Sequence, residues 1–391
     1  MPAIAGNAAE PPLMDSYYAL VRRCGGGVEG ACATVPPAPP VSECELPMID
    51  VGCLTGSCGA VDEEERASCA AAIARAAEEW GFFQVRNHGV RPELLAAMRR
   101  EQARLFRLPF DVKARAAPGG GLLNDSYRWG TPTATSLQQL SWSEAFHVPL
   151  AGVSGDACNF GDLTDLRCVR ACWLLRSLAM YVLVGTTMFY TTFHDVIKTS
   201  SCCYRDVTRE VAGAMSKLAS TLATVLAEAV LGHAPAGESF PEGCDETTCF
   251  LRLNRYPPCP FSPDTFGLVP HTDSDFLTVL CQDHVGGLQL MKGDAWVAVK
   301  PIPGALIVNI GDLFQAWSNN RYKSVEHKVT TNATMERYSV AYFLCPSYDS
   351  PIGTCKEPSP YMPFTFGDYR RKVQEDVKRT GKKVGLPSFL V

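Results

Sequence analysis

Apolar positions recur at helical spacing in the first half of the chain and at strand spacing in the second half. Residues 62–80, 92–106 and 209–231 place apolar side chains every three or four positions, which predicts three amphipathic helices. From about residue 249 onward, short apolar runs alternate with Pro, Gly, Asn and Asp, a pattern typical of a β-sandwich or barrel. We therefore expect an α+β fold, with helices first, a β-core later and a last helix at about 366–380.

The composition divides the chain into six segments. Residues 1–45 are rich in Pro, Gly and Ala and predict a poorly ordered tail. The other segments are a mixed helical region at 46–167, an atypical stretch at 168–208, a helix packed on the barrel at 209–248, the β-core at 249–345 and a C-terminal helical segment at 346–391.

The atypical stretch 168–208 differs from its surroundings in composition. It holds four of the chain's 17 cysteines and an uncharged run at 177–193. That run has 17 residues, four of them threonines, whereas a membrane span needs about 20 mostly apolar residues. We therefore expect a partly buried or loosely packed insertion and no membrane helix.

Charge and cysteine content narrow the range of partners and locations. The formal net charge is −5, and Lys and Arg are scattered, which disfavours nucleic acid as a partner. The first residues lack a charged start followed by an apolar run, so we expect no secretory signal. An odd number of cysteines without a C-x-x-C pair favours reduced thiols in the cytoplasm, with the nucleus as a second location left open.

One His-x-Asp tripeptide, His271 to Asp273, precedes an apolar strand. Residues two apart in an extended chain point to the same side, so the imidazole and the carboxylate can meet one ion. His327, on a later predicted strand, can supply a third ligand. Two His and one carboxylate bind one face of Fe(II) in non-haem oxygenases and leave the opposite positions open. Unrelated surface or core histidines are the alternative interpretation.

A second candidate site lies on the predicted strand that begins at Arg337. Arg337 and Ser339 are two residues apart and therefore face the same way. A guanidinium there can grip a carboxylate through two parallel charge-assisted hydrogen bonds. An ordinary surface arginine is the alternative.

Together these residues and their neighbours resemble the plant soluble Fe(II)/2-oxoglutarate-dependent dioxygenases. The matching motifs are HTD at 271–273, His327, RYS at 337–339, NRYPPC at 254–259, WGFFQVRNHGV at 80–90, GGLQL at 286–290 and NIGDLFQAWSN at 309–319. Within that family, the chain is most similar to the gibberellin 2-oxidases of the class that acts on C20 gibberellins. This finer resemblance depends on the segments 126–149, 270–278 and 345–352.

The resemblance implies a double-stranded β-helix, or jelly roll, with iron at one open end. By analogy, the iron ligands are His271, Asp273 and His327. The 2-oxoglutarate-binding residues implied by the family are Arg337, Ser339, Tyr256 and Asn254. The implied reaction is 2β-hydroxylation of a gibberellin, which inactivates the hormone or its precursor. It consumes O2, converts 2-oxoglutarate to succinate and CO2, and uses ascorbate as reductant.

The substrate assignment and the atypical stretch leave alternatives open. Arg128 is the candidate anchor for the gibberellin carboxylate, with a structural or surface arginine as the alternative. Another plant dioxygenase of this family, acting on a flavonoid or a different terpenoid, is the competing enzyme. Because the resemblance covers about 46–167 and 209–391, residues 168–208 look inserted, and a retained intron or an alternative exon is our hypothesis. An inactive product is then a further alternative. The oligomeric state stays open.

Other polar residues near these motifs are expected to serve the structure. We expect structural roles for His88 and His147. Asp275 and Asp312 fit no ligand spacing, so we expect them in turns or helix caps.

Overall fold

The computed structural model describes most of the chain outside 153–187. The described residues are 9–23, 41–56, 62–115, 127–132, 134–152, 188–235, 240–241, 244, 247–262 and 265–391; between 188 and 205, only Tyr204 has a described side chain.

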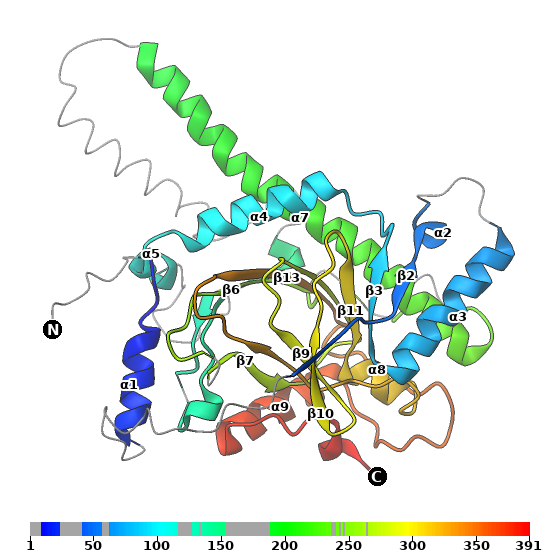
Figure 1. Ribbon diagram of the computed structural model, residues 1–391. Coiled ribbons are helices and arrows are strands. Elements are labelled where there is room, and N and C mark those ends of the chain that lie inside the picture. The colour runs from blue at the N-terminus through cyan, green and yellow to red at the C-terminus, as the bar shows by residue number, and fades with distance from the viewer. Residues whose placement is uncertain are drawn as a thin grey trace.

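Strands from two regions of the sequence form the core (Figure 1). The first group is β1 (Ser42–Cys44), β2 (Met48–Asp50), β3 (Phe82–Arg86), β4 (Tyr127–Trp129) and β5 (Glu144–Pro149). The second group is β6 (Phe250–Tyr256), β7 (Phe266–His271), β8 (Leu277–Gln282), β9 (Leu288–Lys292), β10 (Ala295–Val299), β11 (Leu306–Ile310), β12 (His327–Thr330) and β13 (Arg337–Leu344).

These strands make two sheets that pack against each other as a jelly roll. The eight-stranded sheet has the order β2-β3-β11-β8-β13-β6-β5-β4, and the five-stranded sheet has the order β1-β10-β9-β12-β7. Strands β6 to β13 supply four strands to each sheet, and their pairings are antiparallel. Apolar side chains from both sheets, among them Ile307 and Leu290, form a common buried cluster. The expected α+β jelly roll is confirmed.

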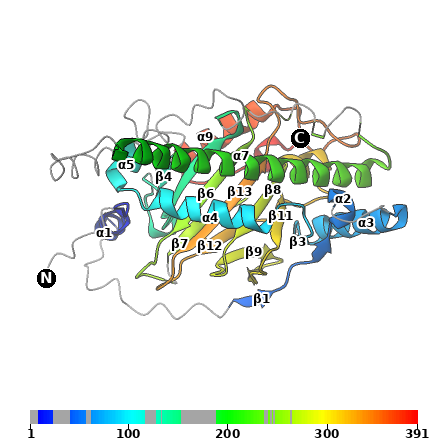
Figure 2. The same ribbon diagram turned by 90° about the horizontal axis from the view of Figure 1, so that it is seen from above.

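Helices cover the outer face of the eight-stranded sheet (Figure 2). Helix α7 (Met188–Leu231) contacts β13 and β8 and lies beside α4 (Pro92–Phe106) and α3 (Glu63–Glu79). Leu251 and Leu253 of β6 point outward into this helix–sheet core, because alternate residues of a strand face opposite sides. The other helices are α1 (Leu13–Arg23), α2 (Gly52–Thr55), α5 (Phe110–Arg115), α8 (Asp312–Trp317), α9 (Phe366–Thr380) and the 3₁₀ turns η1 (Leu137–Gln139), η2 (Leu150–Gly152) and η3 (Leu386–Phe389).

The expectation that residues 1–45 form a poorly ordered tail is wrong for two segments. Residues Leu13–Arg23 form α1, and Ser42–Cys44 pair with β10 as β1. Leu13, Tyr17 and Leu20 recur at helical spacing on the buried side of α1, where Tyr17 stacks on Phe261 at 3.6 Å. The high Pro and Gly content around this helix concealed its amphipathic pattern.

The predicted boundary between an insertion and a helix at 208/209 is also different in the structure. Helix α7 begins at Met188 and continues through this boundary without a break, and Tyr204 and Thr208 are already buried against the core. In Figure 1 its first turns extend beyond the sheets. Residues 168–187 lie outside the described residues, so their predicted character stays a prediction.

The part of α7 from Asp206 to Leu231 is long and apolar enough to cross a membrane by length and composition alone. Its apolar side chains are accounted for by packing, because Val211, Leu218 and Leu222 are buried in the helix–sheet core. A core helix of a globular domain passes the same test of length and composition.

A buried group of charges fixes β5 and β6 to the start of the chain. Glu144 is fully buried and accepts hydrogen bonds from Lys113 Nζ at 2.6 Å, Tyr127 Oη at 2.5 Å and Arg255 Nη1 at 2.7 Å. Arg255 also donates to Glu10 at 2.7 Å. Because β6 presents Arg255 outward, its neighbours on either side face the barrel interior.

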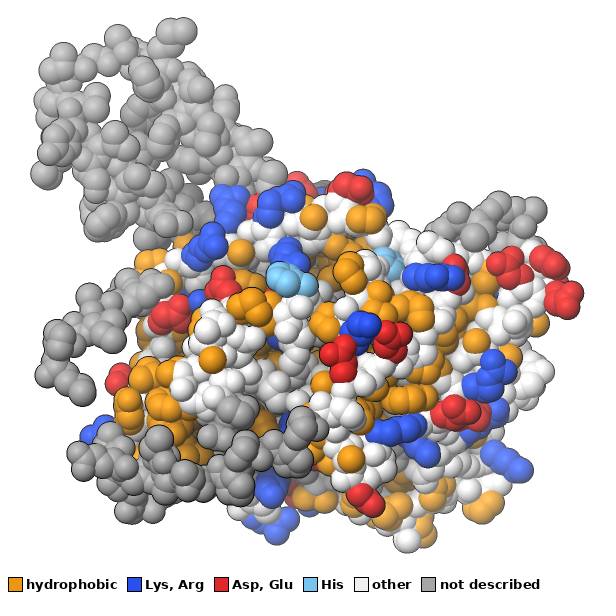
Figure 3. Space-filling model, in the orientation of Figure 1, with side chains coloured by type: hydrophobic (Ala, Val, Ile, Leu, Met, Phe, Trp, Pro, Cys, Tyr) orange, Lys and Arg blue, Asp and Glu red, His pale blue; other side chains and the backbone are white. Residues whose placement is uncertain are grey.

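The described thiols are free, and charges of both signs lie on one face of the surface. Nine cysteines in the described part of the chain carry free thiols. On the face shown in Figure 3, acidic and basic side chains of the described residues are interspersed.

Candidate metal centre

Three side chains converge where β7 ends and β12 begins. His271 is the last residue of β7, Asp273 follows two positions later, and His327 is the first residue of β12. His271 and His327 are paired across the antiparallel ladder. One ligand atom from each of the three side chains lies within 4.8 Å of the others. Pairing of the two strands therefore assembles a possible metal site from distant parts of the sequence.

Hydrogen bonds orient both imidazoles toward one point. Nδ1 of His271 lies 2.8 Å from the carbonyl oxygen of Val269, and Nδ1 of His327 lies 3.0 Å from that of Val325. A carbonyl oxygen only accepts, so each Nδ1 carries the proton and each Nε2 keeps a free lone pair. The two Nε2 atoms lie 3.6 Å and 3.7 Å from Oδ1 of Asp273.

Two hydrogen bonds to Oδ2 hold the carboxylate of Asp273 in place. Its Oδ2 accepts hydrogen bonds from Thr278 Oγ1 at 2.7 Å and Asn309 Nδ2 at 2.8 Å. Both donors lie on neighbouring strands of the eight-stranded sheet. Asp273 therefore presents Oδ1 to the two imidazoles in a fixed orientation, as a metal ligand requires.

The protonation states also suit a metal site. Burial lowers the pKa of His271 far below the usual histidine range, and the neighbouring His327 lowers it further. Burial opposes ionisation of Asp273, but His327, His271 and the two hydrogen-bond donors hold its pKa below the usual range. At neutral pH the centre thus offers neutral imidazole and ionised carboxylate, the forms that bind metals.

An incompletely paired guanidinium lies inside the barrel on β13. Arg337 is 3% exposed, and its Nη2 donates to Gln282 Oε1 at 2.9 Å. Its Nε and Nη1 are buried without a hydrogen-bond partner among the described residues. Burial lowers the pKa of Arg337, although the neighbouring Tyr256 favours its charged form. A buried cation with unused donors is costly and fits an anionic ligand with two acceptor oxygens.

The other residues expected at this site lie in register with Arg337. Tyr256 pairs with Arg337 across the β6–β13 ladder, and Asn254 pairs with Ser339. The Tyr256 ring lies 4.9 Å from the guanidinium carbon of Arg337, and Asn254 Nδ2 donates to Ser339 Oγ at 3.3 Å. From the outer face, Gln102 of α4 donates to the carbonyl oxygens of Asn254 and Ser339 at 3.0 Å and 2.8 Å. All four expected residues thus form one cluster.

The candidate substrate anchor, Arg128, is exposed on β4 at the edge of the eight-stranded sheet. It pairs with Ala145, which in turn pairs with Asn254, so Arg128 faces the same side as Asn254. Arg252, two residues before Asn254, shares this face, and its Nε donates to Asn254 Oδ1 at 2.9 Å. Burial and the nearby charge of Arg128 lower the pKa of Arg252. Arg252 was not among the residues expected at this site, although strict alternation through β6 indicates the side to which it points.

The two histidines expected to be structural make contacts away from the metal centre. Nε2 of His88 lies 3.0 Å from the carbonyl oxygen of Gly304, and its Nδ1 accepts from the backbone of Val90 at 3.2 Å. The ring of His147 packs 4.1 Å from that of Phe250. The contacts of His88 fit the expected structural role, whereas His147 pairs with Arg252 across the β5–β6 ladder, so its structural role stays a prediction.

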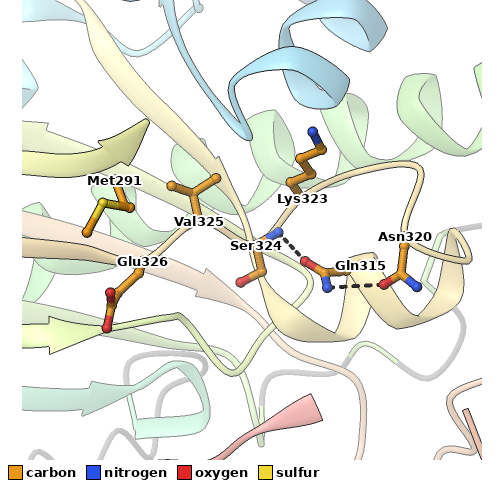
Figure 4. Close-up of a pocket in the computed structure, with 7 residues that line it drawn as sticks. All are labelled: Met291, Gln315, Asn320, Lys323, Ser324, Val325 and Glu326. Atoms are coloured by element: carbon orange, nitrogen blue, oxygen red, sulfur yellow. Dashed lines mark hydrogen bonds between the residues drawn. The ribbon is translucent and has the colours of Figure 1, made fainter. Parts of the chain in front are cut away.

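A surface hollow of about 430 Å³ lies behind the residues that lead into β12 (Figure 4). Among the residues that line it, Gln315 of α8 accepts from the backbone of Ser324 at 2.7 Å and donates to Asn320 at 3.1 Å. The hollow contains none of the three converging side chains. The hydrogen bonds of Gln315 hold the loop that leads to Val325, whose carbonyl oxygen bonds His327.

Comparisons with known proteins agree with this geometry. Residues 247–346 match the model of the 2OG-Fe(II) oxygenase superfamily, and residues 46–156 match that of the non-haem dioxygenase N-terminal region. Gibberellin 2-beta-dioxygenase 6 of Oryza sativa subsp. japonica is 60% identical, over 100% of this chain and 98% of that protein. Gibberellin 2-beta-dioxygenase 8 of Arabidopsis thaliana is 49% identical, over 90% of this chain and 88% of that protein.

Solved structures show the same architecture. The rice dioxygenase for auxin oxidation is 30% identical, with a TM-score of 0.61 over 89% of this chain and 100% of that chain. JOX2 in complex with 2OG, Fe and JA is 28% identical, with a TM-score of 0.61 over 93% of this chain and 97% of that chain. The chain belongs to the 2OG-Fe(II) oxygenase superfamily.

Proposed function

We propose that the protein hydroxylates a gibberellin at the 2β position and couples this to oxidative decarboxylation of 2-oxoglutarate. Two observations carry the proposal together: the convergence of His271, Asp273 and His327, and the unpaired buried donors of Arg337. Membership of the superfamily supplies Fe(II) and 2-oxoglutarate as cofactor and cosubstrate. The relatives that are 60% and 49% identical supply the reaction and the substrate class.

In this proposal the iron ligands are His271, Asp273 and His327. Two imidazole nitrogens and one carboxylate oxygen form the donor set that suits Fe(II) and leaves open positions for other ligands. With 2-oxoglutarate bound, the iron supplies the activation of O2. The carbonyl oxygens of Val269 and Val325 orient the two imidazoles. Two hydrogen-bond donors hold the carboxylate, so that all three ligand atoms lie on one side of the ion.

We further propose that Arg337 and Ser339 hold the carboxylate of 2-oxoglutarate that is distant from the iron. The unused Nε and Nη1 donors of Arg337 match a carboxylate, which accepts two parallel hydrogen bonds from a guanidinium. Tyr256 and Asn254 then contact the cosubstrate from β6. Gln102 supports this cluster, because it joins the backbones of the two strands that carry it.

For the substrate, we propose that Arg128 and Arg252 bind carboxylate groups of the gibberellin. A gibberellin is an apolar skeleton that bears carboxylate, so its site needs apolar walls and a small number of cationic anchors. The two arginines share the inner face of the sheet beside Asn254, and Phe250 and Phe343 stack at 4.5 Å farther along the same strands. Two guanidinium groups held near each other favour an anion that neutralises them.

The proposal also covers the cellular location of the enzyme and its preference among gibberellins. We propose that the enzyme acts in the cytoplasm, where free thiols persist. We also propose C20 gibberellins as the preferred substrates, which the two arginines support because such substrates bear more than one carboxylate.

The test is an assay of the purified full chain with Fe(II), ascorbate, 2-oxoglutarate and a panel of C20 and C19 gibberellins. We expect a gain of one oxygen atom in a C20 gibberellin, read by mass, together with formation of succinate. Turnover of a flavonoid or another terpenoid, with no gibberellin oxidised, would favour the competing dioxygenase. An inert protein would favour the hypothesis that residues 168–208 inactivate the enzyme.

A further inference from the structure

The C-terminal segment of the chain hydrogen-bonds the turn at 271–274, which carries the first two proposed iron ligands. Beyond α9, the segment turns back at Gly385, and the side chain of Lys383 reaches the residues between His271 and the start of β8. Lys383 Nζ donates to the carbonyl oxygen of Thr272 at 2.9 Å and to Ser274 Oγ at 2.8 Å. These two residues flank Asp273 directly.

The same ammonium group pairs with a buried carboxylate. Lys383 Nζ lies 2.8 Å from Asp312 Oδ2, and its side chain is 13% exposed. An ammonium group has three donors, and these three acceptors use all of them. Lys383 therefore occupies one defined position, in contrast to a surface lysine that samples many.

Asp312 connects this lysine to the turn and to α9. Its Oδ2 accepts from Thr272 Oγ1 at 3.1 Å and from the hydroxyl of Tyr369, and its backbone N–H donates to the carbonyl oxygen of Asp273 at 3.0 Å. Burial raises the pKa of Tyr369 well above the usual range, and Asp312 raises it further, so the hydroxyl remains a donor. Asp312 lies in the first turn of α8, at a helix start as expected, and its carboxylate also joins three separate segments.

A glycine allows the C-terminal segment to approach so closely. Gly385 has a φ of +73°, and a Cβ there would lie 3.2 Å from Asp312 Oδ2 and 3.3 Å from the Tyr369 hydroxyl. Any other L-residue would be strained by its backbone conformation and would press on the carboxylate. The backbone is thus shaped to bring Lys383 to the turn.

We propose that Lys383 is a positioning residue for the metal centre: by binding Thr272 and Ser274 on either side of Asp273, it fixes the direction of that carboxylate toward the ion. Lys383 is not one of the three side chains that converge on the proposed metal position. The inference rests on the proposed iron ligands His271 and Asp273. Hydrogen-bond partners behind metal ligands usually affect metal affinity by about 10–100-fold, and Lys383 is such a partner for the turn.

The test compares two adjacent lysines. Lys383→Met removes the ammonium and keeps the length of the side chain, whereas Lys382→Met makes the same substitution and the same charge change at an exposed position. The probe is Mn(II), whose free ion is measured by electron paramagnetic resonance during titration of the metal-free full chain. We expect the Kd for Mn(II) to rise about tenfold in Lys383→Met and to stay within about twofold of the wild type in Lys382→Met.

The outcomes separate this inference from the proposed function. Equal Kd values for the wild type and Lys383→Met would overturn the positioning role while leaving the metal centre intact. A wild-type protein that does not bind Mn(II) would overturn both. If Lys383→Met fails to fold, Ser274→Ala decides the question, because it removes one acceptor and leaves the lysine in place. A weaker Mn(II) affinity with an unchanged Tm of the metal-free Ser274→Ala protein supports the role, and an unchanged affinity refutes it.

Discussion

Replacement of Arg337 by lysine tests the proposed 2-oxoglutarate site most selectively. The substitution keeps a positive charge at a buried position but replaces a planar fork of donors with a single ammonium group. Arg337 uses Nη2 for Gln282 and has Nε and Nη1 free among the described residues. Lysine can satisfy a carboxylate oxygen but cannot form two parallel hydrogen bonds.

The expected effect follows from the loss of one charge-assisted hydrogen bond to the cosubstrate. Such a bond contributes about 1.5–3 kcal/mol, and about 1.4 kcal/mol corresponds to a tenfold change in affinity. The KM for 2-oxoglutarate should therefore rise about 10- to 100-fold. The kcat at saturating 2-oxoglutarate should change little, because Arg337 lies outside the group of residues that converge on the metal.

Steady-state kinetics with varied 2-oxoglutarate, read as succinate formed, measure this effect. Arg371→Lys on the exposed side of α9 is the matched control, and its kinetics should equal those of the wild type. A KM in Arg337→Lys within about twofold of the wild-type value would refute the assignment of this guanidinium to the cosubstrate.

Three further predictions address the substrate site, the core and the response to pH. Arg252→Gln should raise the KM for a gibberellin about tenfold or more and the KM for 2-oxoglutarate by a smaller factor, because Arg252 also holds Asn254; equal KM values for the gibberellin in the variant and the wild type would exclude a substrate contact. Lys113→Met should lower the free energy of unfolding by about 3 kcal/mol in urea titrations, because the buried charge of Glu144 loses a partner. Burial lowers the pKa of His88, so below about pH 6.5 the unfolded chain binds a proton that the folded protein does not. Stability of the metal-free protein should therefore fall from pH 7.5 to 5.5, and His88→Gln should reduce that fall; an identical pH dependence in the variant would contradict this.

The strand patterns predicted the barrel well because burial on opposite faces leaves a clear alternation. In β6, the residues Leu251, Leu253 and Arg255 face outward, and Asn254 and Tyr256 face inward, as alternation requires. The helices at 92–106 and 366–380 coincide with α4 and α9. Each has a clear start, Pro92 in the first turn of α4 and the Thr365 capping box at α9.

The elements that the sequence patterns did not predict depend on contacts between residues far apart in the chain. Helix α1 is short and stable only through packing on residues such as Trp142 and Cys259. Strand β4 has three residues and gains its ladder from β5, so no periodicity was visible in the sequence. The same holds for the contact between Lys383 and Thr272, which are 111 residues apart. No local pattern indicates such a contact.

The most direct test of the account is the ratio of succinate to hydroxylated gibberellin in the wild type and in Asp273→Asn. The account predicts about one succinate for each oxygenated gibberellin in the wild type, and neither product above background in the variant, because the amide no longer offers an ionised ligand beside His271 and His327. Wild-type turnover by Asp273→Asn would contradict the proposed metal centre.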